Sequence, residues 1–144
     1  MPSWVNEGFQ TYHKRLPPEI TLSLVEIPME KRGKAVNLKN VQQKEIKAIR
    51  QNIGKNHLLI SLDPKGKRLS TEKLATFIDQ WKLEGTNATL LIGGPEGLPD
   101  ELLNLSDLRW SLSDMTFPHP LVRVILAEQI YRATTILSGH PYHK

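Results

Sequence analysis

The chain has 144 residues, of which 39% are hydrophobic and 24% charged, and this fits one globular domain spanning residues 1–144. It contains no cysteine, which excludes disulfides, thiolate metal sites and a thiol nucleophile. The 19 Lys and Arg residues outnumber the 15 Asp and Glu residues, an excess that permits a polyanionic partner without requiring one. No apolar run approaches the ~20 residues of a membrane span and no signal-peptide pattern opens the chain, so we expect a cytoplasmic protein.

Five segments carry apolar residues at helical spacing. Asn37 is a suitable N-cap, and Gly54 stands where a left-handed residue usually ends a helix. The predicted helices are Met1–Leu16, a helix from Asn37 to about Ile53, one from Ser70 or Thr71 to Gly85, a short one after Pro99, and a long one from Leu121 that ends at Ser138-Gly139.

Four further segments have strand-like patterns. Ile20–Ile27 alternates apolar and polar residues, as a half-buried strand does, and the others are His57–Leu62, Thr89–Ile92 and Trp110–Leu112. Thr89–Ile92 suits a strand that is covered on both faces. Strands that alternate with helices predict an α/β fold, with a mostly parallel sheet and helices on both faces. The basic loop Lys31–Lys34 is by default a solvated charge run, and nucleic-acid contact is the sharper alternative.

Three glycines and a proline follow the third strand, in the loop Gly93–Gly97. The loop lacks the lysine and hydroxyl of a P-loop and the spacing of a dinucleotide fingerprint, so a tight turn and a ligand loop are about equally favoured by the motif. A second unusual loop, Leu112–Pro120, follows the next strand, and two loops at one edge of a parallel sheet can face each other across a ligand. Their amides and apolar side chains suit a neutral ring and a sulfonium group better than a triphosphate.

The chain ends in a tail, His140–Lys144, that follows Gly139. His140 and His143 are three residues apart, but no helix aligns them there, so a metal site is not expected. Tyr142 can stack on a base, beside an imidazole and a lysine, which favours an RNA contact; the alternative is a tail that only caps the helix.

Polar residues of the last loop and helix have two interpretations each. His119 lies between two prolines and is either a rigid loop residue or a base contact. Arg123 and Arg132 are typical of a solvated helix face or of an interface.

Six segments, taken in chain order, carry a family resemblance: Leu91–Leu98, Trp110–Ser113, Thr116–Val124, Glu128-Gln129, Tyr131–Ala133 and Pro141–Lys144. Together they resemble the ribosomal RNA large subunit methyltransferase H family, a small member of the SPOUT superfamily. The resemblance implies S-adenosylmethionine as methyl donor, a C-terminal trefoil knot and a homodimer. It also implies methylation of the ring imide nitrogen (N3) of a pseudouridine in large-subunit (23S) ribosomal RNA, with the assembled ribosome as the expected substrate.

The resemblance places the methyl donor among three loops, formed by Leu62, by Gly93, Gly94, Pro95, Glu96 and Gly97, and by Leu112, Ser113, Asp114, Met115, Thr116 and Phe117. The imide nitrogen must lose its proton, so a general base or a cation that stabilises the imide anion is useful. The candidate catalytic residues are Arg132, His119, Tyr142 and His143. Two alternatives stay open: a non-catalytic RNA-binding protein that retains the fold, and a related knotted methyltransferase acting on transfer RNA.

One departure from the family pattern concerns the start of the chain. The family usually begins with a short apolar strand and a glycine turn, ahead of the segment that starts here at Met1. Either the start site is assigned late or the chain is shortened. We expect a sheet without that strand to leave backbone groups unpaired and apolar helix faces uncovered.

Overall fold

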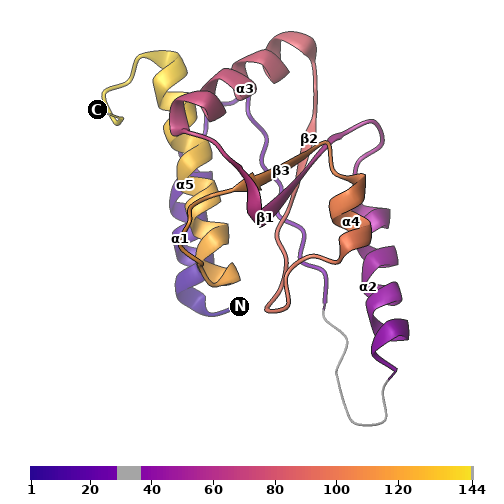
Figure 1. Cartoon of the computed structure of the whole chain (residues 1–144). Helices are drawn as coiled ribbons and strands as arrows, with labels where there is room; N and C mark the ends of the chain where they lie inside the picture. The colour runs from indigo at the N-terminus through magenta and orange to yellow at the C-terminus, as the bar shows by residue number, and fades with distance from the viewer. Residues whose placement is uncertain (29–36, 144) are drawn as a thin grey trace.

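A computed structural model describes residues 1–28 and 37–143, with a small parallel sheet between two groups of helices (Figure 1). The helices α1 and α5 lie on one side of the sheet, and α2 and α4 on the other (Figure 1). This arrangement confirms the predicted α/β fold, while the predicted basic loop Lys31–Lys34 lies outside the described residues. The elements are α1 (Ser3–His13), α2 (Leu38–Asn52), β1 (Leu58–Arg68), α3 (Thr71–Glu84), β2 (Ala88–Leu91), α4 (Asp100–Leu105), β3 (Leu108–Ser111) and α5 (His119–Ser138).

Local capping signals set four of the helix ends. The side-chain oxygen of Asn37 accepts a hydrogen bond from Lys39 N at 3.0 Å, and Ser70 Oγ accepts one from Lys73 N at 3.1 Å. Each bond satisfies a backbone donor that the first helical turn leaves unpaired. Gly85 and Gly139 end α3 and α5 with φ of 67° and 74°, where glycine has no Cβ penalty. These predicted ends are confirmed.

The predicted left-handed conformation of Gly54 is wrong. Helix α2 ends earlier, with Ile53 as an extended C-cap, and Asn56 is the residue with positive φ, at 62°. The turn closes through a hydrogen bond from His57 N to the Gly54 carbonyl at 3.1 Å. A Cβ on Gly54 would overlap the His57 imidazole, which is held by Thr89 Oγ1 at 2.8 Å. Glycine is therefore required here by a close approach of a side chain and not by φ.

Strand β1 extends beyond the predicted end at Leu62. Leu62 and Lys67 both lie opposite Trp110, so the residues between them bulge out of the ladder and the chain then returns to the same partner. A Cβ on Gly66 would lie 2.6 Å from the carbonyl carbon of Arg109, so glycine permits this close return. Residues Asp63–Gly66 thus form a bulge within a longer strand.

The predicted strand Ile20–Ile27 is wrong, because this segment has no strand conformation. Its alternation still has a physical role, since Ile20 and Leu22 pack against the hydrophobic core. His13 Nε2–H donates to the Leu22 carbonyl at 2.6 Å, and Glu26 pairs with Arg123. A strand also needs a hydrogen-bonded neighbour, and no strand in the described part of the chain pairs with this segment.

A largely apolar cavity of about 1230 Å³ lies where the coil passes β2. In the described residues β2 pairs only with β1, which leaves its other edge open. The indole Nε1 of Trp110 lines the cavity and is buried without a partner in the described part. The apolar lining includes Leu22, Leu24, Ile49, Ile53, Leu90 and Ile92.

The core holds β1 against α3 and α5. Ile60 is 2% exposed and lies in one cluster with Leu74 of α3 and Leu126 of α5. Replacing such a buried aliphatic side chain by alanine typically costs about 2–5 kcal/mol, so this contact fixes the strand ends on which the site depends. Among the helices in the described ranges, none has both the length and the apolar character to cross a membrane.

Candidate active site

The carboxyl ends of the three strands bring the predicted donor loops to one edge of the sheet. The sheet order is β2-β1-β3, all parallel. The register pairs Ser61 with Leu91 and Leu62 with Trp110, so the ends of β2 and β3 lie beside the point where β1 leaves the ladder after Leu62. In open α/β sheets, ligands bind outside the carboxyl ends of the strands. Leu62, the loop Gly93–Gly97 and the loop Leu112–Phe117 start from this edge.

The glycine loop is a tight turn. Gly97 N donates to the Gly94 carbonyl at 2.9 Å, and Gly97 has a φ of 77°, which favours glycine. Pro95 and Glu96 form its exposed tip. The tight-turn interpretation of the motif therefore describes the backbone correctly. The glycines of the turn have no side chains, so a ligand can also approach their peptide groups closely.

Gly93 is the glycine that the turn tolerates changing least. A Cβ at this position would lie 2.6 Å from the Gly97 carbonyl carbon and 2.8 Å from Leu98 N, both of them backbone atoms that cannot rotate away. We expect Gly93→Ala to lower the free energy of unfolding by about 1–3 kcal/mol, the usual cost of overpacking. Urea denaturation measures this, with Pro95→Ala at the exposed tip as control. Equal midpoints for both variants would contradict the geometry.

The third loop is tied to the end of β1. Ser111 Oγ donates to the Ser113 carbonyl at 3.0 Å, and Ser113 Oγ accepts from Met115 N at 3.0 Å. Asp114 forms an ion pair with Arg68 at 2.6 Å. The pair is exposed and contributes little to stability, but it links the loop after β3 to the last residue of β1 and neutralises the charge of Asp114.

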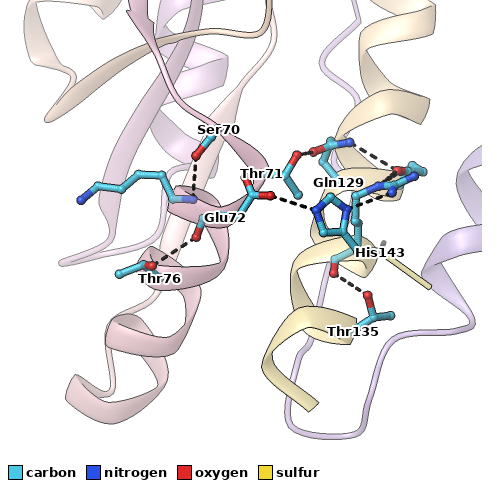
Figure 2. Close-up of polar contacts among 10 residues, drawn as sticks. Ser70, Thr71, Glu72, Thr76, Gln129, Thr135 and His143 are labelled. Carbon is cyan, nitrogen blue, oxygen red and sulfur yellow. Dashed lines mark hydrogen bonds and ion pairs between the residues drawn. The ribbon is translucent and has the colours of Figure 1, made fainter. Parts of the chain in front are cut away.

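The tail folds back onto α5 and places Tyr142 and His143 beside Arg132. Arg132 Nη1 donates to His143 Nδ1 at 3.1 Å, and the guanidinium carbon lies 4.8 Å from the centre of the Tyr142 ring. The Tyr142 ring meets Tyr131 edge-on, with centroids 4.8 Å apart. On its other side, His143 Nε2 lies 2.9 Å from Oε1 of Glu72 at the start of α3 (Figure 2). Arg132, Tyr142 and His143, here called the tail cluster, are thus brought together.

The tail cluster offers a fixed cation and a phenol donor. Glu128 Oε1 accepts from Arg132 Nε at 2.7 Å, and this bond raises the pKa of Arg132 above its ordinary value, so the guanidinium stays charged. Burial raises the pKa of Tyr142, so its hydroxyl keeps its proton at neutral pH. Neither residue suits the role of a general base. Arg132 suits stabilisation of an anion, and Tyr142 suits stacking and hydrogen-bond donation.

His119, the fourth predicted catalytic residue, does not join the tail cluster. It begins α5, 13 residues before Arg132, which corresponds to about 20 Å along a helix at 1.5 Å per residue. It lines the large cavity beside β2 together with Arg123. Arg123 is 12% exposed and pairs with Glu26, so it is not part of a solvated face. A contact of His119 with a base stays a prediction.

Sequence reasoning missed the two carboxylates that hold the tail cluster. Glu128 stands four residues before Arg132 on α5, a helical spacing that signals an ion pair and was available in the sequence. Glu72 lies 71 residues from His143 in the chain, so no local pattern predicts their contact.

The comparison with known proteins covers these same segments. A family model described as a predicted SPOUT methyltransferase matches residues 1–143. The chain is 50% identical to the ribosomal RNA large subunit methyltransferase H of Ectopseudomonas mendocina over 144 residues, which cover 100% of this chain and 93% of the relative. The chain belongs to the ribosomal RNA large subunit methyltransferase H family of SPOUT methyltransferases. Proteins of that name from Pseudomonas fluorescens and Pseudomonas putida are 49% identical to it, with the same coverage.

Membership of the SPOUT methyltransferases confirms the resemblance predicted from the sequence. The similarity runs through the glycine loop, the loop after β3 and the tail, so all parts of the candidate site lie within the matched residues. The residues that bind the donor or act in catalysis, and the trefoil knot, stay predictions for this chain.

Proposed function

We propose that this methyltransferase transfers a methyl group from S-adenosylmethionine to the ring imide nitrogen (N3) of a pseudouridine in large-subunit ribosomal RNA. The observation that carries the proposal is the similarity over all 144 residues to relatives named ribosomal RNA large subunit methyltransferase H. The tail cluster supports it, because an aromatic ring and a fixed cation suit an RNA base. The reaction and its substrate place the protein in the cytoplasm.

The three loops fit S-adenosylmethionine chemically. Peptide groups of the glycine turn suit the polar edges of an adenine ring, and Leu62, Leu112 and Phe117 suit its faces and the thioether-like chain. These loops also carry the carboxylates of Glu96 and of Asp114, and Arg68 balances the charge of Asp114. Such groups suit the ribose hydroxyls and the ammonium of the donor. We assign binding of the donor to Leu62, Gly93–Gly97 and Leu112–Phe117.

The tail cluster supplies the groups that the transfer requires of the protein. When bound, the donor supplies an electrophilic methyl group on a sulfonium. The protein must align the imide nitrogen, exclude water and remove the imide proton. Arg132 stabilises the imide anion, and Tyr142 stacks on the base. His143 accepts the proton at Nδ1, which carries a lone pair because it faces an arginine donor, once Arg132 turns to the anion.

A transfer assay separates this function from its alternatives. Purified protein is incubated with labelled S-adenosylmethionine and intact ribosomes, free ribosomal RNA or transfer RNA. We expect label in large-subunit RNA, with intact ribosomes as the best substrate. Donor binding in calorimetry without transfer to any RNA contradicts an enzyme and favours the RNA-binding alternative. Label in transfer RNA alone favours the related knotted methyltransferases.

We also propose a homodimer in which α1 and α5 lie at the interface. Helix α5 is buried or half-buried on most of its faces and packs against α1 and α3 within the chain. Each helix keeps an exposed apolar side chain, since Trp4 of α1 is 51% and Leu137 of α5 is 37% exposed. Exposed apolar surface on a helix pair of this kind suits burial by a second copy. We also propose that the C-terminal part of this chain forms the trefoil knot expected for the superfamily.

The dimer predicts a specific effect of Trp4. We expect wild-type protein to scatter light as a dimer at tens of micromolar, and Trp4→Asp to scatter as a monomer, because a buried unpaired carboxylate is costly. Leu83→Asp is the matched control, since Leu83 of α3 is 81% exposed and lies outside the proposed interface. A wild-type monomer, or the same mass for both variants, would contradict the proposed interface.

A further inference from the structure

We propose that Glu72 is a positioning residue of this enzyme, which binds His143 and thereby holds the Arg132–His143 pair ready for the substrate. The inference rests on the proposed function and extends it to the first turn of α3. Glu72 and His143 are 71 residues apart in sequence and meet only through the fold (Figure 2). Glu72 does not touch the reacting atoms in this proposal; it acts through the imidazole.

The hydrogen bonds around His143 fix its tautomer. Arginine only donates, so the 3.1 Å bond from Arg132 Nη1 requires an unprotonated Nδ1. The proton then lies on Nε2, which donates to Glu72 Oε1 at 2.9 Å. A carboxylate that accepts from one imidazole nitrogen and thereby orients the other is a recurring arrangement in catalytic and metal sites. Glu72 therefore sets the orientation of the nitrogen that accepts the imide proton.

Two further hydrogen bonds fix the start of α3, where Glu72 lies, relative to α5. Thr71 Oγ1 donates to Gln129 Oε1 at 2.7 Å and ties the start of α3 to α5, while Gln129 Nε2 lies 3.3 Å from Glu128 Oε1 (Figure 2). Glu128 in turn holds Arg132. The two carboxylates thus hold the two ends of a chain of bonds that runs from α3 through His143 and Arg132 back to α5.

Exposure indicates that this contact serves orientation more than folding. The Glu72 side chain is 67% exposed, whereas that of His143 is 25% exposed. Exposed pairs contribute little to global stability, so the fold does not depend on this contact. The hydrogen bond from His143 lowers the pKa of Glu72 below its ordinary value of 4.5, which keeps the carboxylate ionised at neutral pH. What the bond restrains is the His143 imidazole, in a tail that α5 also holds through Arg132 and Tyr131.

The first test measures the tail without any catalysis. Amide hydrogen exchange of His140, Tyr142 and His143 is compared in wild type, Glu72→Ala, Glu72→Gln and Asp79→Ala; Asp79 is an exposed carboxylate on the same helix. We expect at least fivefold faster exchange in Glu72→Ala. Glu72→Gln, whose amide oxygen still accepts from Nε2, and the Asp79→Ala control should stay within twofold of wild type. Unchanged exchange in Glu72→Ala overturns the proposal, whatever the activity.

The second test measures methyl transfer in a double-mutant cycle. We expect Glu72→Ala to lower kcat about fivefold at unchanged donor affinity, and Glu72→Gln to recover most of that loss. In a chain without residues 140–144, Glu72→Ala should change nothing further, because its effect passes through His143. Faster tail exchange with wild-type kcat, or equal losses with and without the tail, overturns the positioning role. No transfer by wild type, with exchange as expected, refutes the proposed function and leaves the tail contact intact.

The pH dependence of amide protection in the tail distinguishes this role from simple packing, because packing alone would not depend on the ionisation of Glu72. The charged or titratable groups that face His143 are Glu72 on α3, Arg132 and Glu128 on α5, and Tyr142 in the tail. Because the folded pKa of Glu72 is lowered, its contribution is complete above pH 4.5 and is lost as pH falls through the lower folded value. We expect tail protection to fall in that acid range in wild type and much less in Glu72→Gln. Identical profiles contradict the proposal.

Discussion

We expect Gly94→Val to abolish binding of S-adenosylmethionine while the protein stays folded. Gly94 follows the end of β2, and its carbonyl closes the turn by accepting from Gly97 N at 2.9 Å. A branched side chain here would take up space beside the peptide groups of the turn, which the donor is proposed to contact. Calorimetry should show an affinity at least 100-fold weaker, about 2.7 kcal/mol.

A graded pair of variants separates this effect from misfolding. Gly94→Ala adds one methyl group and should retain part of the affinity, so the order of binding is glycine, alanine, valine. Circular dichroism and the urea midpoint check that each variant is folded. A folded Gly94→Val variant with wild-type affinity would remove the glycine loop from the donor site.

We expect removal of His140 to Lys144 to lower methyl transfer at least tenfold, which corresponds to about 1.4 kcal/mol of lost transition-state stabilisation. The truncated enzyme loses the Tyr142 ring and the His143 imidazole that lie against Arg132, whereas Glu128 still holds the guanidinium. Donor affinity and dimerisation should stay nearly unchanged, because the three donor loops and the outer side of α1 and α5 are intact. Single-turnover transfer to ribosomes measures the loss.

Arg132→Lys and Tyr142→Phe refine the role of the tail cluster. Lysine keeps the charge but not the fork of donors that reaches Glu128 and His143 together, so we expect a loss comparable to that of the truncation. Phenylalanine keeps the stacking face, so Tyr142→Phe should lose less than Tyr142→Ala. Full-length rates in the truncated enzyme would show that the tail only caps α5.

Features that depend on neighbouring residues were predictable from the sequence. The caps at Asn37 and Ser70 and the glycine ends of α3 and α5 use side chains and φ angles within a few residues of the helix end. The order of helices and strands and the loops that follow β2 and β3 result from the same local patterns. The methyl donor and the reaction were predicted from the family resemblance, because hydrophobic periodicity indicates secondary structure and not chemistry.

Features that depend on distant partners were not predictable. Ile20–Ile27 has the alternation of a strand, yet a strand forms only where a neighbouring edge accepts its hydrogen bonds. The return of β1 to Trp110 depends on the close approach of Gly66 to Arg109. The contact of Glu72 with His143 joins the first turn of α3 to the end of the chain. In each case the fold determines which residue is the partner. That partner is distant in the sequence, so a local sequence pattern cannot predict the contact.

Mass mapping of the methylated nucleotide tests the account most directly. Ribosomes that lack the modification are incubated with the purified protein and S-adenosylmethionine, and the large-subunit RNA is digested and analysed by mass spectrometry. The account predicts one added methyl group on a pseudouridine, located on the ring imide nitrogen N3, and its loss in the truncated enzyme. A methyl group on a ribose, on another base or on transfer RNA, or none at all in the presence of bound donor, would contradict it.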